Sequence, residues 1–370
     1  MTVARPTLAV CVLARSTRGG LARLLDEVDG LADEIVIGVD EQSADETWAI
    51  AAARADVVFR FEHVGPPVRA RLLPIAHARA DWVLSLDEDE GLDEALASLL
   101  PELVRDPRYT HYWLPRKWIV NRQPLTYLHD VPWFPDWQLR LFRRDPRRVW
   151  HPGILHSGYR VMGPGCREDR VAILHYEPVI LTPEERDAKV EYYRQHGSQG
   201  RSDAAYRSMD DAECRQSTSG PAPAVRRAGG RRSRVLPDVQ AVPPVPASPP
   251  WRATLDVRMA GEAFAGSAML VDVRARNIGP LAWEPVSAWP RLHLSCHVRT
   301  PDERVALWDG PRFPMPRVVE PGETARFVIE FRAPLEPGDY VVEWDMVSEG
   351  EAWFADCGSE TTRTTLRVVA

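Results

Sequence analysis

Short apolar runs alternate with helix-like segments over the first 90 residues. Runs of strand length occupy residues 8–13, 34–40, 57–61 and 82–86. Between them, Leu21, Leu24, Leu25 and Val28 recur at the spacing of one helix face, a second helix is expected from residue 45, and residues 67–78 are expected to be partly helical. This alternation predicts an α/β domain with a mainly parallel, Rossmann-like sheet flanked by helices.

The pattern changes after residue 251, where short runs alternate between apolar and polar positions. These runs cover residues 254–259, 268–276, 291–298, 324–332, 339–347 and 362–369. Turn residues such as those at 321–323 separate them, and no helical spacing is present. The pattern predicts an all-β, antiparallel sandwich.

A segment of different composition lies between these two regions. Thr182, Pro183 and Glu185 have the spacing of a capping box, which predicts a helix running to about residue 195 that closes the first domain. Residues 198–250 are rich in Ser, Gly, Pro, Arg and Ala, a composition that favours a flexible linker. We therefore expect domains at 1–197 and 251–370, joined by a linker at 198–250. An alternative role for the linker arginines is contact with an anionic membrane.

Composition and charge narrow the classes of function. A chain of 370 residues with 44% hydrophobic content can bury two cores. The net charge of −7 shows no excess of basic residues that could contact nucleic-acid phosphates, so no nucleic-acid partner is expected. Five scattered cysteines without a CxxC pair favour neither a zinc site nor a disulfide framework. With no apolar stretch of membrane-spanning length, we expect a cytoplasmic protein, at most peripheral to the inner face of the membrane.

Four consecutive acids, Asp87 to Glu90, follow the apolar run that ends at Leu86. Carboxylates this close repel one another unless a cation or strong donors lie among them. Mg²⁺ and Mn²⁺ prefer such oxygen ligands, and ligands of open α/β sheets bind at the carboxyl ends of strands. The alternative is a solvated acidic turn that caps the helix starting near Leu92.

Four sequence blocks resemble those of the family 2 inverting glycosyltransferases of GT-A fold, in the lipopolysaccharide-core glucosyltransferase-like branch. The blocks lie at residues 33–47, 80–90, 134–143 and 173–176, and the resemblance covers about residues 5–197. It implies a GT-A domain that uses a nucleoside-diphosphate sugar. Two motifs depart from the family pattern, at Gln42-Ser43-Ala44-Asp45 and at Arg69-Ala70-Arg71-Leu72.

Candidate donor-site residues come from the strand ends and from the resemblance. Asp40 can accept hydrogen bonds from a nucleobase or a ribose, and the alternative is a turn acid satisfied by backbone amides. Asp87 would lie near the ribose, while Asp89 would bind a Mn²⁺ or Mg²⁺ ion that neutralises the diphosphate. Arg69 or Arg71 would lie along the pyrophosphate, although surface arginines are more common than catalytic ones.

Asp136 is the predicted catalytic base, because the resemblance places it in the block that carries the acceptor-side acid. An inverting transfer needs one group to accept the acceptor's proton. The alternative is an N-cap for a helix over residues 137–143. His156, and less strongly His151, would complete the metal sphere or bind phosphate.

Aromatic side chains are dense between residues 109 and 150, a composition typical of sugar sites and also of ordinary cores. Trp133, Phe134 and Trp137, near two prolines, are predicted to form an acceptor wall. Trp113 and Trp118 fit a strand and are expected to be core.

The C-terminal region resembles the immunoglobulin-like modules appended to many bacterial glycosyltransferases, through residues 277–283, 319–323, 337–340 and 353–354. This resemblance implies a docking or carbohydrate-contacting module.

Together these features predict a metal-dependent inverting glycosyltransferase, a hexosyltransferase-like enzyme acting in the synthesis of cell-surface glycans or specialised glycoconjugates. The acceptor would be a hydroxyl of a glycan, a lipid-linked molecule or another compound. The alternative is a non-catalytic nucleotide-sugar or glycan-binding protein with a degenerate transferase domain, which the two departing motifs suggest. A nucleotidyltransferase, which also needs paired acids and a metal, is a third and more distant alternative.

Overall fold

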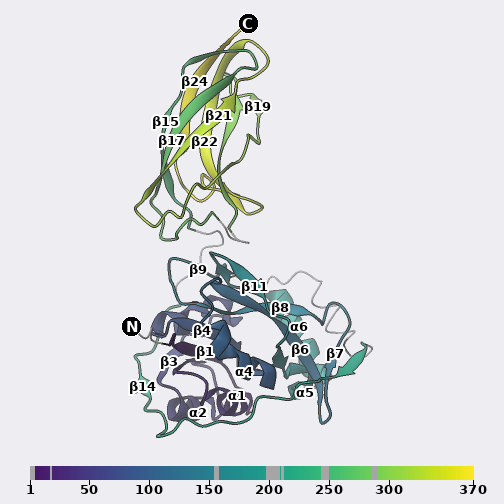
Figure 1. Ribbon diagram of the computed structural model, residues 1–370. Helices are drawn as coiled ribbons and strands as arrows, with labels where there is room; N and C mark the ends of the chain where they lie inside the picture. Colours follow the sequence, from purple (N-terminus) through teal and green to yellow (C-terminus); the bar gives the residue numbers. More distant parts are fainter. Residues whose placement is uncertain are drawn as a thin grey trace. The chain divides into compact units, whose positions relative to one another are not determined.

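The computed structural model of the chain describes residues 5–16, 19–153, 158–196, 209, 212–242, 250–285 and 290–370. The chain divides into two compact units (Figure 1). The first comprises Met1–Arg144, Trp150–Tyr159 and Gly165–Val245, and the second Asp145–Val149, Arg160–Pro164 and Pro246–Ala370. Each unit is made of separate stretches of the chain. The predicted domains at 1–197 and 251–370, with a linker at 198–250, stay a prediction.

The first unit is built around one sheet, which has 12 strands among the described residues. Its main path runs in the order β13-β7-β6-β8-β4-β1-β2-β3-β14. The strands on this path are β1 (Leu8–Ala14), β2 (Glu34–Asp40), β3 (Val57–Phe61), β4 (Trp82–Asp87), β6 (His111–Arg122), β7 (Leu125–Leu128), β8 (Asp136–Arg143), β13 (Cys214–Gln216) and β14 (Arg234–Val235). The short strands β5 (Glu90–Leu92), β11 (Gly165–Arg167) and β12 (Ile173–His175) pair off the path. A separate two-stranded sheet pairs β9 (Val149–Trp150) with β10 (Arg160–Val161), which belongs to the second unit.

The direction of the strands changes halfway across this sheet. β4, β1, β2 and β3 pair with one another in parallel, as predicted, and β14, which was not predicted, adds to β3 in parallel. β8 is antiparallel to both β4 and β6, and β7 is antiparallel to both β6 and β13. The mainly parallel sheet that we predicted is therefore a mixed sheet. The reason is that β6, β7 and β8 follow one another without crossover helices, and short connections join antiparallel strands.

Except for a short helix at Glu177–Ile180, the described helices form where helices were expected. They are α1 (Gly20–Val28), α2 (Thr47–Arg54), the 3₁₀ turn η1 (Pro67–Arg69), α3 (Leu72–His77), α4 (Glu94–Leu103), α5 (Glu177–Ile180) and α6 (Pro183–Gln195). Leu21, Leu24, Leu25 and Val28 of α1 are fully buried in the same core cluster as residues of β1, β2 and β4. The capping box at Thr182 is confirmed. No helix in the described ranges is both long enough and apolar enough to cross a bilayer.

Part of the segment predicted as a flexible linker is ordered against the first unit. β13 and β14 lie within residues 198–250 and pair with β7 and β3. The Arg231 side chain is 2% exposed and forms ion pairs with Asp29, at 2.6 Å, and with Asp56. It also donates hydrogen bonds to the backbone oxygens of Asp29 and Ala32, each at 2.7 Å. Strand pairing, hydrogen bonds and ion pairs fix this part of the chain, and Ala222 adds one side chain to the core cluster of the first unit.

Arg231→Ala is expected to destabilise the first unit by about 2–4 kcal/mol, because it removes the cation that pairs with two acids and the donor to two backbone carbonyl groups. Thermal or urea unfolding of the full chain would measure this loss. Arg232→Ala is the matched control, since Arg232 is the next residue and is exposed. Equal stability of the two variants would show that this anchor contributes little.

The second unit contains two β-sheets that bury apolar side chains between them. One sheet has the order β15-β17-β21, from β15 (Ala253–Arg258), β17 (Ala268–Asn277) and β21 (Thr324–Arg332). The other has the main order β16-β24-β22-β18-β19, from β16 (Glu262–Phe264), β18 (Leu292–Arg299), β19 (Val305–Leu307), β22 (Gly338–Ser348) and β24 (Thr362–Val369), with β20 (Phe313–Pro314) and β23 (Ala352–Trp353) at its side. Phe331 meets Trp344 across the core, with ring centroids 5.6 Å apart. The six predicted strands are confirmed within two residues at each end.

Candidate functional site

The acidic turn lies at the carboxyl ends of the parallel strands, as predicted. Asp87 is the last residue of β4 and pairs in register with Leu13 of β1, which in turn pairs with Gly38 of β2. Asp40, the last residue of β2, is therefore at the same edge of the sheet. α1 begins beside the turn, and Gly20 permits this approach because a Cβ there would be 2.8 Å from the Glu88 backbone oxygen.

Asp40 is buried, and both of its carboxylate oxygens have partners. Oδ2 lies 2.7 Å from Nδ1 of His63, and Oδ1 accepts a hydrogen bond from the backbone amide of Gln42 at 2.9 Å. The backbone bond matches the alternative of a turn acid, while the imidazole adds a polar group at the end of β3. His63 was absent from our predicted site.

Asp87 is held by two arginines. Arg71 makes a two-pronged contact, at 2.8 and 3.1 Å, and Arg140 of β8 lies at 2.7 Å. Burial would raise the pKa of Asp87, but the Arg140 and Arg71 guanidinium groups outweigh it and hold the pKa well below its usual range. Of the two predicted pyrophosphate arginines, the structure brings Arg71 to the acidic turn and leaves Arg69 exposed on η1.

Glu90 connects the acidic turn to the predicted base. Its fully buried carboxylate accepts hydrogen bonds from Arg140 at 2.7 Å, from Arg116 at 3.1 Å and from the Asp87 backbone amide at 3.0 Å. Arg116 also pairs with Asp136 at 2.8 Å. A continuous chain of ion pairs thus runs from Asp87 through Arg140, Glu90 and Arg116 to Asp136.

Asp136 is the first residue of β8, opposite Arg116 of β6 in the sheet register. Because residues 136–143 form a strand, the alternative of a helix N-cap is wrong. The carboxylate also accepts hydrogen bonds from Trp118 Nε1 at 3.0 Å and from Gln138 at 2.7 Å. Burial acts to raise the pKa of Asp136, but Arg116 and these donors lower it below its usual value. The carboxylate is therefore ionised at neutral pH and less basic than an ordinary aspartate.

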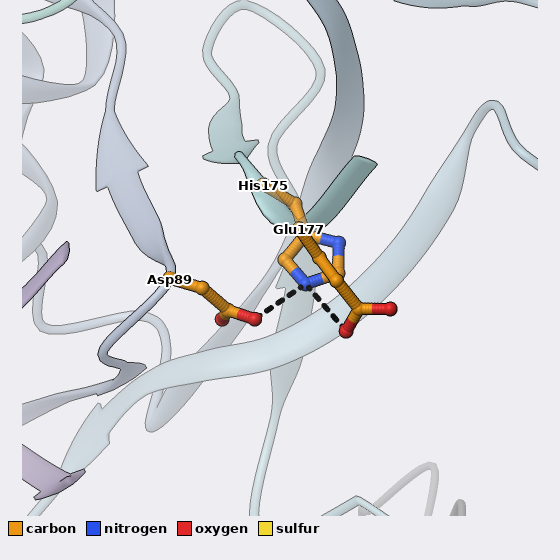
Figure 2. A group of neighbouring side chains, drawn as sticks. All are labelled: Asp89, His175 and Glu177. Carbon is orange, nitrogen blue, oxygen red and sulfur yellow. Dashed lines mark ion pairs between the residues drawn. The ribbon is translucent and has the colours of Figure 1, made fainter. Parts of the chain in front are cut away.

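Asp89, His175 and Glu177 form a compact group beside this chain of ion pairs (Figure 2). Figure 2 shows the His175 ring between the two carboxylates, with Nε2 3.3 Å from Asp89 and 3.9 Å from Glu177. β12 places His175 in register with Glu90 of β5 and Trp118 of β6. The three ligand atoms lie within 4.8 Å of one another, a donor set that suits Mn²⁺ or Mg²⁺.

The charges around this group fit a cation. Burial and the neighbours Asp89 and Asp87 raise the pKa of Glu88 to about 8. Burial raises the pKa of Asp89, but His175 and Lys189 outweigh it and bring that pKa to about 2. Glu177 forms an ion pair with Lys189, yet its Oε1 is buried without a hydrogen-bond partner among the described residues. The donors present therefore fit a metal ion, with Asp89 the most accessible of the three at 24% side-chain exposure.

Of the two predicted histidine ligands, one lies within the described residues. His156 lies outside the described residues. His151 is buried, and its Nδ1 accepts a hydrogen bond from the Gly153 backbone amide at 3.0 Å. Within the described ranges, the imidazole beside Asp89 belongs to His175.

The predicted acceptor aromatics separate into two environments. Trp133 is 4% exposed and packs edge-to-face on Trp118, with centroids 4.9 Å apart, in a cluster with Leu128. That position is typical of core, so Trp133 does not present a face to an acceptor in this structure. Phe134 and Trp137 are only partly buried, which leaves them as the accessible members of the predicted wall.

Comparison with known proteins supports one class, the glycosyltransferases. The chain is 26% identical over 183 residues to the lipopolysaccharide core biosynthesis glycosyltransferase LpsC of Rhizobium meliloti. The match covers 47% of this chain and 64% of LpsC, so it spans less than two thirds of that relative. No family model matches the chain.

Solved structures show weak likenesses. TarS of S. aureus aligns with a TM-score of 0.34 and 10% identity, over 98% of this chain and 77% of TarS. A structure of TarS residues 1–349 gives a TM-score of 0.33 and 12% identity, over 55% of this chain and 69% of that one. The sporulation control protein Spo0M of Bacillus subtilis gives 0.23 and 18% identity, over 32% of this chain and 50% of Spo0M.

Proposed function

We propose that the first unit is a metal-dependent, inverting glycosyltransferase of family 2 with a GT-A fold, using a nucleoside-diphosphate sugar. The observation that carries this proposal is the acidic turn at the end of β4, which is linked by buried ion pairs to Asp136 and lies beside the Asp89, His175 and Glu177 group. The similarity to LpsC supports the transferase class.

Donor recognition is assigned to the edge of the sheet formed by β2 and β4. Asp40 and His63 offer a carboxylate and an imidazole to the base or the ribose. Arg71 carries positive charge next to Asp87, where a pyrophosphate would gain charge-assisted hydrogen bonds. Asp87 in turn fixes the direction of the Arg71 guanidinium group.

Asp89 and His175, with Glu177 behind them, would hold the Mn²⁺ or Mg²⁺ ion. The ion, when bound, neutralises charge on the diphosphate leaving group. Lys189 forms an ion pair with Glu177 and leaves Asp89 and His175 as the more available donors.

Asp136 acts as the general base. As the acceptor oxygen forms its bond to the anomeric carbon, the bond to the diphosphate breaks on the opposite face and the hydroxyl proton passes to an Asp136 carboxylate oxygen. Arg116, Trp118 and Gln138 hold this carboxylate in one orientation. Phe134 and Trp137 supply apolar surface for the acceptor sugar.

The setting of this reaction is part of the same proposal. We assign the acceptor to a glycan or lipid-linked hydroxyl in the synthesis of cell-surface glycans, with the protein in the cytoplasm or peripheral to the inner face of the membrane. The second unit is proposed as an immunoglobulin-like module that docks or contacts carbohydrate.

Calorimetric titration with UDP, GDP and dTDP, with and without Mn²⁺, tests the donor class. We expect one nucleotide to bind, and to bind at least about tenfold more tightly with Mn²⁺, because the ion offsets the repulsion between the diphosphate and the acidic turn. Asp40→Asn should weaken that binding, whereas Asp302→Asn, in an exposed turn of the second unit, should not. Failure of all three nucleotides to bind would contradict the proposal.

The competing function is a non-catalytic protein that binds nucleotide sugars or glycans. The ion pairs favour it, because Asp87 and Asp136 are both engaged by arginines and Glu177 by Lys189. Turnover of the donor separates the two functions.

A further inference from the structure

A groove of about 590 Å³ lies on the outward face of the three-stranded sheet in the second unit. Its lining comes from all three strands, β15, β17 and β21. The lining residues are Thr254, Leu255, Asp256, Arg274, Arg276, Thr324 and Arg326. Three of the seven are arginines, and Leu255 is the one apolar member.

The strand register gathers these side chains on one face. Arg276 pairs with Thr254 on one side and with Thr324 on the other. One row along, Arg274 pairs with Asp256 and with Arg326. Ala275, between the two β17 arginines in sequence, is buried, so Arg274 and Arg276 point outward together.

The positive charge of the groove is only partly neutralised, because its three arginines have two acids beside them, Asp256 in the lining and Asp272. Arg326 forms a two-pronged ion pair with Asp272, at 2.8 and 2.9 Å. Among the described residues, neither Arg274 nor Arg276 makes a side-chain hydrogen bond or an ion pair. Arg274 and Arg326 stand directly opposite each other, an arrangement of like charges that destabilises a sheet.

This concentration of charge contrasts with the rest of the region. Residues 251–370 contain 13 arginines, no lysine and 18 acidic residues. A basic groove in an acid-rich domain marks a local site for an anion rather than a general property of the surface.

We propose that the groove binds an anionic glycan, with Arg274 and Arg276 contacting its phosphate or carboxylate groups. Guanidinium groups match these anions in a two-pronged geometry, and Thr254 and Thr324 offer hydroxyls to neighbouring sugar hydroxyls. The lining has no aromatic ring on which a nucleobase could stack. The choice of a glycan rests on the proposed function, for which the groove would hold a charged part of the acceptor.

The test uses the full chain and a phosphorylated oligosaccharide, with the neutral oligosaccharide of the same length as reference. Wild type should bind the phosphorylated form by calorimetry and not the neutral one. The double variant Arg274→Ala with Arg276→Ala should bind at least about tenfold more weakly, because two charge-assisted contacts are lost. Replacing both arginines by lysine should retain part of the affinity, since lysine keeps the positive charge but lacks the planar guanidinium group.

Arg304→Ala with Arg367→Ala is the matched control, since it removes the same charge from exposed positions outside the groove and should leave binding unchanged. The proposal would be overturned if the Arg274/Arg276 double alanine variant bound the phosphorylated oligosaccharide as tightly as wild type does. It would also be overturned if wild type bound the neutral oligosaccharide as tightly as the phosphorylated one. Tighter binding of inorganic phosphate, single-stranded DNA or anionic phosphatidylserine vesicles than of the phosphorylated oligosaccharide would overturn it as well.

Nucleotide titration of the same variants keeps this proposal distinct from the transferase proposal. The Arg274/Arg276 double variant should retain wild-type nucleotide affinity. Wild type that binds the phosphorylated oligosaccharide but no nucleotide would contradict the transferase alone, and the reverse pattern would contradict the groove alone.

Discussion

Asp136→Asn should lower turnover by about 10²-fold or more while nucleotide affinity stays near that of wild type. The amide cannot accept a proton at neutral pH, but its shape is that of the carboxylate. Its oxygen can still accept from Arg116, and Gln138 can rotate its own amide to face the new NH₂ group. Single-turnover transfer, nucleotide titration and thermal unfolding would be measured together.

Asp187→Asn serves as the control, because it is the same Asp-to-Asn substitution at an exposed position on α6. Nearly normal turnover in Asp136→Asn would move the base to another residue, with His156 the next candidate. If turnover and nucleotide affinity fell together with the unfolding temperature, the change would have damaged the structure that Arg116 and Glu90 support.

The apolar pattern predicted the parallel half of the first sheet well, and the antiparallel half poorly. β1, β2 and β4 are almost completely buried, so each reads as an uninterrupted apolar run. In β8, polar and apolar residues are mixed, and this pattern carries no information on the direction of the strand. Direction is set by the connection, and the short path from β6 through β7 turns the chain back without a helix.

The composition of residues 212–242 predicted a flexible linker, and the local sequence again did not show the contacts that order this segment. A segment rich in Arg, Gly and Pro has few apolar side chains to bury, so a flexible linker was the natural expectation. The segment is instead held by Arg231, whose acceptors Asp29 and Asp56 lie some 175 residues or more away in sequence. Such a pairing leaves no periodic signal.

Asp40 and Asp87 were predictable because each one ends a strand, and Asp89 lies in the turn directly after β4. Asp136 was predicted from the block of family resemblance. The partners of these acids were not predictable, since Arg116 and Arg140 stand inside strands where an arginine usually faces solvent. His175 lay in one of the four blocks of family resemblance, so a metal role could have been considered for it. Its closeness to Asp89 follows from the pairing of β12 with β5, which depends on tertiary structure.

Asp89→Ala should abolish donor hydrolysis and weaken Mn²⁺ binding by about 10²-fold or more, since even the outer partners of metal ligands contribute about 10–100-fold. The backbone should stay in place, because the Asp89 carbonyl still accepts the hydrogen bond from the Tyr176 amide. His175→Ala should reproduce the loss of Mn²⁺ affinity, and Asp187→Ala, an exposed acid on α6, should change neither quantity. Hydrolysis by wild type that vanishes in Asp89→Ala eliminates the non-catalytic alternative. Undiminished Mn²⁺ affinity in both Asp89→Ala and His175→Ala would place the metal elsewhere, and a wild type that binds nucleotide without ever hydrolysing or transferring its sugar would favour the binding protein.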